Sequence, residues 1–507
     1  MKKTVFIKNA AILTASALIL RLAGIIFKIW IAKLIGSEGV GLYQLIFSFY
    51  MLAATFATSG ISTAVTRLVA EELALGSKRG ILKIFYRCVG IISILAAISL
   101  VTVFFAAEFI AETLIGDIRA LSALKILSFS LPFMGISSCL RGYFIAVRRV
   151  TPNALSQIFE QGIRILLIFI LVKKYIVKGL SAACAAVLFG DAAAELLACS
   201  LLFLVFLKDT NKLNTLTGRA YPNYGVTRKI THIALPITSG RYLNTALRTA
   251  ENVLVPKNLA RFPLSGANSL SQFGMIKGMA LPILFFPSTL LNSISTLLIP
   301  EMSESAAKNR FGIVKASTER ILKLTLLISF IVAAIFFVLG EEIGYLIYKS
   351  EDIGFLLKAL SPIVPFMYLD SISDGILKGL DQQGFTFRTA VSDSVIRIIL
   401  ILLILPLCGM KGFIGIMYFS NFFTCVLNVK RLLKVTKAKL NFFYEIIFPL
   451  ISAVAISQIL NLLFFKFHKF GNLAFLLVLI PITLLVYLSF LIGFKIVKKD
   501  EILFKFA

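Results

Sequence analysis

The side chains with the clearest chemical potential are cations that fall inside long apolar segments. Arg21 and Lys28 stand seven residues apart in one segment, and Arg241 and Arg248 repeat that spacing in another. Seven residues is two turns of an α-helix, so each pair lies on one helix face. A charge in a membrane core is costly unless it is hydrated or paired. Four such cations would bind an anion, and snorkelling of the side chains toward headgroups is the alternative.

A second group combines acids with arginines at helical spacing. Glu160 precedes Arg164 by four residues, and Asp393 precedes Arg397 by the same interval. Side chains at i and i+4 are neighbours on a helix, so each pair neutralises itself. The pattern favours a structural clamp within a helix bundle, with a cavity-lining or gating role as the alternative.

Four further acids lie in apolar segments outside those two pairs. They are Asp191, Glu195, Asp370 and Asp374. Carboxylates in such a place could take a coupling proton or Na⁺, or pack against neighbouring donors. We leave both readings open from the sequence.

The sequence contains few residues in the patterns that enzymes use for catalysis. The two histidines, His232 and His468, lie near the ends of apolar segments, and neither belongs to a metal-binding pattern. The sequence has no phosphate-binding GxxxxGK[ST] loop and no metal-spaced His/Cys/Asp cluster. Its six cysteines show no paired spacing. We therefore expect a protein that is not an enzyme and that has no metal or other cofactor apart from a coupling Na⁺ or H⁺.

The elements that must position these side chains are membrane helices. Of the 507 residues, 58% are hydrophobic and only 15% charged, with a mean hydropathy of +0.92. A spanning helix needs about 20 mostly apolar residues. Such segments occur at 10–33, 43–69, 84–107, 120–147, 155–177, 180–206, 230–256, 270–299, 319–340, 354–381, 389–408, 411–432, 443–465 and 472–497. The sequence predicts an all-α membrane protein of about 14 transmembrane helices.

The distribution of charge predicts the orientation of these helices. The net charge of +27 comes from cations that cluster in alternate breaks, so membrane topology explains it better than nucleic-acid binding. Breaks at 208–229, 308–323 and 430–439 are rich in Lys and Arg, whereas the break at 108–117 is acidic; Lys173, Lys174 and Lys178 oppose the trend. We expect both termini in the cytoplasm and 108–117 outside.

The chain also contains an internal repeat. Residues around Pro132-Phe133-Met134 recur 233 positions later around Pro365-Phe366-Met367, and the same shift pairs Gly41 with Gly274. A shift of 220 pairs Arg21 with Arg241. Six helices per repeat is an even number, so the two repeats are parallel and should flank a central cavity. We expect an N-lobe at 1–207, a cytoplasmic linker at 208–229, a C-lobe at 230–432, and two further helices with a tail at 441–507.

Several stretches are similar to those of a known family. They are Arg21-Leu22-Ala23-Gly24, the run from Ala32 to Gln44, Arg67-Leu68-Val69-Ala70-Glu71, Leu140-Arg141-Gly142-Tyr143-Phe144, and the run from Ser156 to Arg164. These motifs resemble the stage V sporulation protein B group. That group belongs to the polysaccharide transporter branch of the multidrug/oligosaccharidyl-lipid/polysaccharide flippase superfamily.

The resemblance implies a function and a set of site residues. It implies export of undecaprenyl-diphosphate-linked saccharides, such as a peptidoglycan precursor for the spore cortex, across a bacterial cell membrane by alternating access. Membrane lipids and this substrate would be the partners, with no nucleic acid. By analogy with lipid II flippases, the diphosphate would contact Arg21, Arg67, Arg241, Arg248 and Lys277. The alternatives are a Na⁺- or H⁺-coupled multidrug or metabolite exporter of the same superfamily, and a membrane scaffold or enzyme of envelope assembly.

Overall fold

The computed structural model describes residues 3–58, 60–211, 225–263, 269–467 and 473–493. Helices account for the regular secondary structure of these residues, and they contain no strand. The prediction of an all-α membrane protein is confirmed, and the described part of each of the 14 expected segments falls on one or more helices. Most of the expected linker (212–224) and the expected tail (494–507) lie outside the described residues. The described chain divides into two compact units, which are treated separately below.

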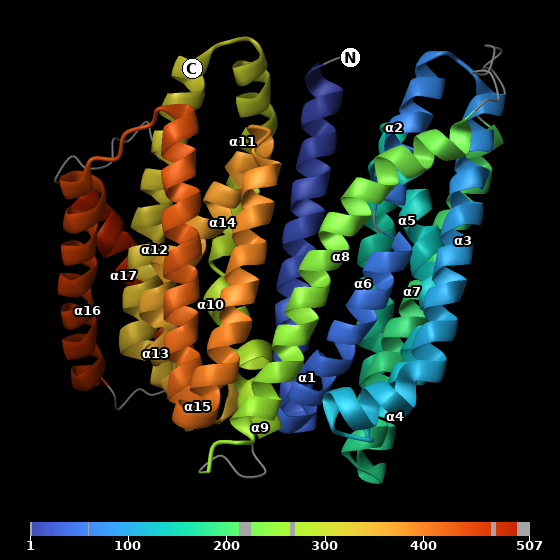
Figure 1. The fold of residues 1–507 in the computed structure, drawn as a ribbon. Helices are drawn as coiled ribbons and strands as arrows, with labels where there is room; N and C mark the ends of the chain where they lie inside the picture. The colour runs from blue at the N-terminus through green and yellow to red at the C-terminus, as the bar shows by residue number, and fades with distance from the viewer. Residues whose placement is uncertain (1–2, 59, 212–224, 264–268, 468–472, 494–507) are drawn as a thin grey trace. The chain divides into compact units, whose positions relative to one another are not determined.

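The first unit comprises residues 1–257 and 267–274 (Figure 1). Its helices are α1 (Lys3–Thr58), α2 (Ile61–Ala74), α3 (Lys78–Phe109), η1 (Ile110–Ile115), α4 (Ala120–Ser128), α5 (Leu131–Ala146), α6 (Thr151–Tyr175), η2 (Ile176–Lys178), α7 (Leu180–Thr210), α8 (Val226–Leu259) and α9 (Ser269–Gly274). The second unit comprises residues 258–266 and 275–507. Its helices are η5 (Met275–Ala280), α10 (Leu281–Phe285), α11 (Ser288–Ala307), α12 (Phe311–Tyr348), α13 (Glu351–Leu360), η6 (Ser361–Ile363), α14 (Val364–Gly379), α15 (Gln383–Thr436), η7 (Phe442–Ile447), α16 (Phe448–Phe467) and α17 (Leu473–Gly493).

The helices α1 and α15 are each much longer than a membrane is thick. Each consists of two helical segments joined by a sharp turn. α1 turns at Gly36 (φ 70°, ψ 176°), and α15 turns at Gly409 (φ 54°, ψ −136°). Positive φ is open to glycine because it has no Cβ. At Gly409 the ring of Phe262 lies 2.6 Å from the place where a Cβ would stand. Each long helix therefore contains two of the expected spans.

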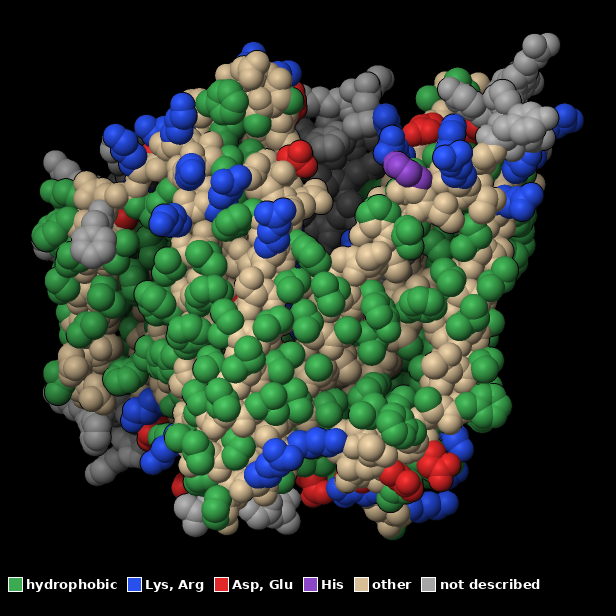
Figure 2. Space-filling model, in the orientation of Figure 1, with side chains coloured by type: hydrophobic (Ala, Val, Ile, Leu, Met, Phe, Trp, Pro, Cys, Tyr) green, Lys and Arg blue, Asp and Glu red, His purple; other side chains and the backbone are tan. Residues whose placement is uncertain are grey.

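The surface matches a chain that spans a membrane. Among the described residues, seven helices are long and apolar enough to cross, or eight if α4 and α5, bent by 42°, form one span. In Figure 2 apolar side chains cover the middle of the visible face, and Lys and Arg gather at its ends, more of them at the end with the N-terminus. An apolar belt between charged ends is what a lipid bilayer requires.

The core of the first unit ties α2, α3, α5 and α7 together around large aromatic side chains. The rings of Phe85 and Phe206 stack at 4.3 Å, and Tyr143 packs edge-on against both. The Tyr143 hydroxyl donates to the buried carboxylate of Asp209, 3.0 Å away, and Arg149 forms an ion pair with the same carboxylate. This core fixes the helices that carry the polar network described below.

α8 packs along the second half of α1, running in the opposite direction. Near one end, Gly60 touches the backbone of Ala234, since a Cβ there would overlap its carbonyl oxygen. Near the other end, Asn252 donates to Ser48 Oγ at 2.9 Å and Thr249 to the Ser48 carbonyl at 3.1 Å. By packing, α8 thus belongs to the first unit, although the sequence repeat places it at the start of the second half.

Candidate functional site

Four cations on α1 and α8 are the candidate anion-binding residues. Arg21 and Lys28 lie on α1, and Arg241 and Arg248 lie on α8; all four side chains are exposed. None of the four side chains has an ion-pair or hydrogen-bond partner among the described residues. Membrane-embedded cations without a protein counter-charge are costly, so the arrangement is suited to an anionic ligand.

The packing of α1 and α8 explains why these side chains remain accessible. Trp30 stacks on Phe169 of α6 at 5.5 Å and so anchors the first half of α1, while Arg21 and Lys28 stay exposed. On α8, the face that carries Thr245, Thr249 and Asn252 contacts α1. At 100° per residue, Arg241 and Arg248 lie at one edge of this face, and both side chains are exposed. They border the α1–α8 seam without being buried in it.

The two other predicted diphosphate contacts are placed differently. Arg67 on α2 forms an ion pair with Glu71 at 3.2 Å, and both side chains are solvent-exposed. Lys277 lies on η5 in the second unit, half-buried, and interacts with another described residue. Arg67 and Lys277 thus both have interaction partners, unlike the four cations on α1 and α8.

A polar network lies inside the first unit, where α5, α6, α7 and α1 meet. Glu160 accepts hydrogen bonds from Arg141 at 2.8 Å and from Arg164 at 2.7 Å. Arg164 also reaches Asp191 on α7 at 2.8 Å, and the Tyr43 hydroxyl donates to the same carboxylate at 3.4 Å. The expected pair of Glu160 and Arg164 is thus part of a network of four charges that joins three helices. The carboxylates are 12% exposed, so these contacts are strong ones.

Glu195 gives this region an excess of acid. It is 92% buried on α7, beside Ser137 of α5, and its Oε1 has no hydrogen-bond partner among the described residues. Together with Glu160 and Asp191 it makes three carboxylates against the two guanidinium groups of the network. A buried carboxylate without a partner favours a proton or a bound cation.

The second unit carries a related but altered arrangement. Asp393 pairs with Arg397 at 2.6 Å and accepts from Ser420 at 2.6 Å. Asp370 accepts from Asn428 at 2.8 Å. Asp374 forms a more exposed pair with Lys378 at 2.5 Å.

The repeat shift of 233 relates the two arrangements. It pairs Glu195 with Asn428 and Ser137 with Asp370, so the acid stands on α7 in one repeat and on α14 in the other. The sequence analysis did not predict that the acid changes helix between the repeats. Each contact, Glu195 with Ser137 and Asp370 with Asn428, joins a charged residue to an uncharged one, so it forms no acid–base pattern in the sequence. Arg141 and Tyr43 were also missed as network members, although both lie in the recognised motifs. Their role depends on contacts between helices that no spacing rule predicts.

Metal-ligating residue types do not cluster in the described part of the chain. The described residues contain no group of three or more His, Cys, Asp or Glu side chains that could hold a metal ion. The six cysteines form no disulfide, and five of them are buried.

Comparison with solved structures identifies the class of protein. A structure described as "Lipid II flippase MurJ, inward closed conformation" matches with a TM-score of 0.71 at 18% identity, covering 96% of this chain and 99% of that one. A multidrug resistance MATE family transporter of the MOP superfamily, in an inward-facing conformation, matches with a TM-score of 0.64 at 14% identity, covering 82% and 95%. At these identities the likeness concerns the fold. The chain is a multi-pass membrane protein with the fold of MOP-superfamily transporters.

Sequence comparison identifies the family. The model of the family described as "Polysaccharide biosynthesis protein" matches residues 6–306, more than half of the chain. The chain therefore belongs to the polysaccharide biosynthesis protein family. "Stage V sporulation protein B" of Bacillus subtilis (strain 168) is 28% identical over 513 residues, which cover 99% of this chain and 98% of that protein. These matches confirm the resemblance found in the sequence and place the chain among transporters rather than enzymes.

Proposed function

We propose that this protein flips an undecaprenyl-diphosphate-linked saccharide across a bacterial cell membrane. The observation that carries the proposal is that four cations on α1 and α8 have no side-chain partner within the described part of the chain. A diphosphate brings its negative charge with it into the membrane, and a guanidinium group can bind it through two parallel hydrogen bonds. Arg21 and Arg241 would supply such groups, while the saccharide crosses in a hydrated cavity and the polyprenyl tail stays in lipid.

The comparisons support the substrate class. One relative is named for stage V of sporulation, and the solved structure with the similar fold is named a lipid II flippase. We infer that the glycan is a peptidoglycan precursor, used for the spore cortex. We further infer from the charge distribution that both termini lie in the cytoplasm, because the cation-rich breaks then lie inside.

The multidrug exporter is the rival function, since a MATE transporter shares the fold. Substrates of such exporters are typically cations. Unpaired basic side chains on α1 and α8 would repel a cationic substrate, so they favour an anionic one. A scaffold role would leave these charges in the membrane without a ligand.

Coupling to an ion gradient is a second component of the proposal. We infer that Glu195 takes up the coupling proton or Na⁺, because its buried Oε1 has no hydrogen-bond partner in the described chain and the region has more carboxylates than guanidinium groups. Asp370 would take the corresponding part in the second unit, where Asn428 already donates to it.

Binding and flipping in vesicles test the anion site directly. Loss of a desolvated Arg–phosphate contact should weaken binding by about 2–4 kcal/mol, or roughly thirty- to a thousand-fold. Arg21→Ala and Arg241→Ala should insert normally and lose transport of defined undecaprenyl-diphosphate lipids. Substitution by Lys should rescue in part, since it keeps the charge and loses the planar fork.

Arg228→Ala provides the matched control. Arg228 is also an exposed arginine of α8 without a partner among the described residues, but it lies in the first turn of the helix. It should bind and flip like the unmodified protein. Wild-type affinity and flipping in well-expressed Arg21→Ala and Arg241→Ala variants would show that the four-cation site does not bind the substrate.

A further inference from the structure

Lysine side chains gather at the end of α6, where the sequence contains cations that oppose the predicted topology. Lys173 and Lys174 lie in the last turn of α6, and Lys178 ends the 3₁₀-helix η2. All three side chains are exposed. With the inferred orientation they lie at the outer end of a spanning helix, where positive charge is disfavoured. Membrane topology therefore does not explain these lysines.

The lysines of α6 continue a stripe of exposed apolar side chains. Leu166, Phe169 and Ile170 are all exposed. Lys173 and Lys174 follow them at helical spacing, so the five side chains share one face of the helix. A stripe of this kind can contact acyl chains along its apolar part and headgroups at its charged end.

The first half of α1 carries a second stripe of the same kind. Ile19, Leu22 and Ile26 are exposed, and the exposed Lys33 follows Ile26 by seven residues, which is two helical turns. At 100° per residue, the two candidate anion-binding cations of α1 lie on the opposite side of the helix. This stripe is therefore separate from the residues proposed to bind the transported diphosphate.

An aromatic stack joins the two stripes. The Trp30 ring stacks on Phe169 at 5.5 Å, and Lys173 Nζ lies 4.3 Å from the centre of the Phe169 ring. Both helices run outward in the predicted topology, and Lys33 follows Trp30 by one turn as Lys173 follows Phe169. Tryptophan favours the level at which acyl chains give way to headgroups. The lysines just beyond the stack, here called the lysine cluster, are Lys33, Lys173, Lys174 and Lys178.

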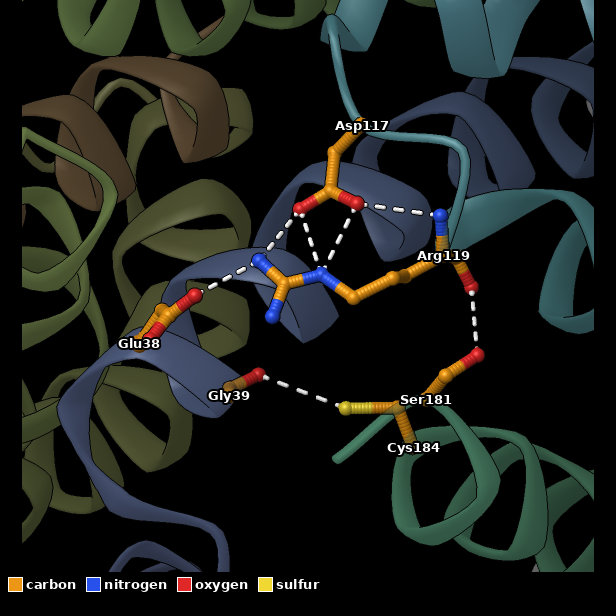
Figure 3. Close-up of polar contacts among 6 residues, drawn as sticks. All are labelled: Glu38, Gly39, Asp117, Arg119, Ser181 and Cys184. Atoms are coloured by element: carbon orange, nitrogen blue, oxygen red, sulfur yellow. Dashed lines mark hydrogen bonds and ion pairs between the residues drawn. The ribbon is translucent and has the colours of Figure 1, made fainter. Parts of the chain in front are cut away.

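The lysine cluster has no counter-charge from the protein. Arg119 takes up two acids at this end of the first unit, since it bridges Glu38 at 2.6 Å and Asp117 at 2.6 Å (Figure 3). Within the described part of the chain, no lysine of the cluster forms an ion pair with an acid; Lys173 and Lys178 contact aromatic rings instead. The ammonium groups are thus left for an anion from outside the protein.

We propose that the lysine cluster and the two stripes bind an anionic phospholipid of the outer leaflet. The phosphate contacts the ammonium groups of Lys33 and Lys173, and the acyl chains lie along the apolar stripes of α1 and α6. The headgroup supplies the missing counter-charge, which offsets the cost of placing lysines outside. This site goes beyond the proposed function, and only its leaflet depends on the inferred orientation.

The single tryptophan of the chain makes the site observable. Trp30 lies in the stack, so all tryptophan fluorescence comes from there. The probes are phosphatidylglycerol and phosphatidylcholine in mixed vesicles, with bromine on the acyl chains of one lipid at a time to quench a tryptophan that it touches. Brominated phosphatidylglycerol should quench Trp30 at the lower mole fraction, and about 1 M salt should remove this preference. Equal quenching by the two lipids at low salt would overturn the proposal.

Charge substitutions assign the preference to the lysine cluster. A basic side chain beside an anionic membrane surface strengthens binding about fivefold. Lys33→Gln and Lys173→Gln should each lower the preference for phosphatidylglycerol by about that factor, whereas Lys173→Arg should keep it. Quenching by brominated phosphatidylcholine should stay the same in all variants, because the stack remains intact.

Lys208→Gln is the matched control. Lys208 is also an exposed lysine in the last turn of a helix, α7, and has no partner among the described residues. It lies outside the lysine cluster, so its substitution should leave the preference unchanged. An unchanged preference in the double variant Lys33→Gln, Lys173→Gln would show that the cluster does not bind the headgroup.

A competition separates a phospholipid from the transported lipid. Undecaprenyl diphosphate without bromine is added to vesicles that contain brominated phosphatidylglycerol. It should relieve no more quenching than the same amount of unbrominated phosphatidylglycerol, and stronger relief would overturn the assignment to a phospholipid. Quenching does not require transport. A purified protein that fails to flip lipid would refute the proposed function, while the quenching results still decide about this site.

Discussion

Replacing Arg164 by Gln should strongly destabilise the first unit. Arg164 is 26% exposed and contacts two carboxylates, Glu160 at 2.7 Å and Asp191 at 2.8 Å, each 12% exposed. Removal of one partner of a buried ion pair costs about 3–5 kcal/mol, because the remaining charge is left unpaired. Here two carboxylates lose a partner, and Arg141 alone remains to balance them together with Glu195. Because these side chains are still partly exposed, we expect the loss in free energy of unfolding to be at the lower end of this range, about 3 kcal/mol.

The assay is reversible unfolding of the purified protein in mixed micelles. Arg67→Gln is the control for stability, since Arg67 forms the same kind of i, i+4 pair with Glu71 but is 68% exposed. It should cost less than about 1 kcal/mol. Asp191→Asn added to Arg164→Gln should recover part of the loss, because it removes one orphaned charge. A loss below about 1 kcal/mol for Arg164→Gln, or strictly additive effects in the double variant, would refute the reasoning.

Three further predictions concern transport and topology. Glu195→Gln should abolish transport driven by an imposed Na⁺ or proton gradient while substrate binding is retained; gradient-driven flipping by this variant would contradict the coupling role. Truncation after Lys439 removes α16 and α17, which lie outside the repeat, and should abolish flipping while the two repeats still insert, because the lipid tail loses its docking helices; a stable truncated protein that flips lipid would reject that role. In intact cells, an impermeant thiol reagent should label Cys introduced at Glu112 but not at Lys437, both exposed; the reverse result would invert the topology.

Much of the fold was predictable because lipid imposes strict rules on a chain. A spanning segment must satisfy its own backbone hydrogen bonds, so long apolar runs become helices regardless of their neighbours. The pairs Glu160 with Arg164 and Asp393 with Arg397 were predictable for the same local reason, since four residues is about one helical turn. The repeat shift also pairs Gly41 with Gly274, and the structure brings these two glycines into contact.

Other features depended on packing between helices that are distant in sequence. The sequence repeat assigned α8 to the second half, whereas its contacts with Ser48 and Gly60 place it in the first compact unit. A sequence repeat shows that two segments have a common origin. A compact unit is defined by which helices pack against one another. The candidate cations Arg21 and Arg241 consequently belong to the same unit by packing, although they come from different repeats.

The sequence by itself determined the helices, the repeat, the family and the candidate charges, because each of these follows from local composition or from comparison along the chain. Only the tertiary structure decided which charges are neutralised. Arg164 contacts two carboxylates, whereas Glu195 Oε1 has no hydrogen-bond partner among the residues that the structure describes. The tertiary structure also joined Gly41 to Gly274 across 233 residues. Electrostatic pairing and close helix contact act over a few ångströms in space, so they are fixed only when distant segments have packed together.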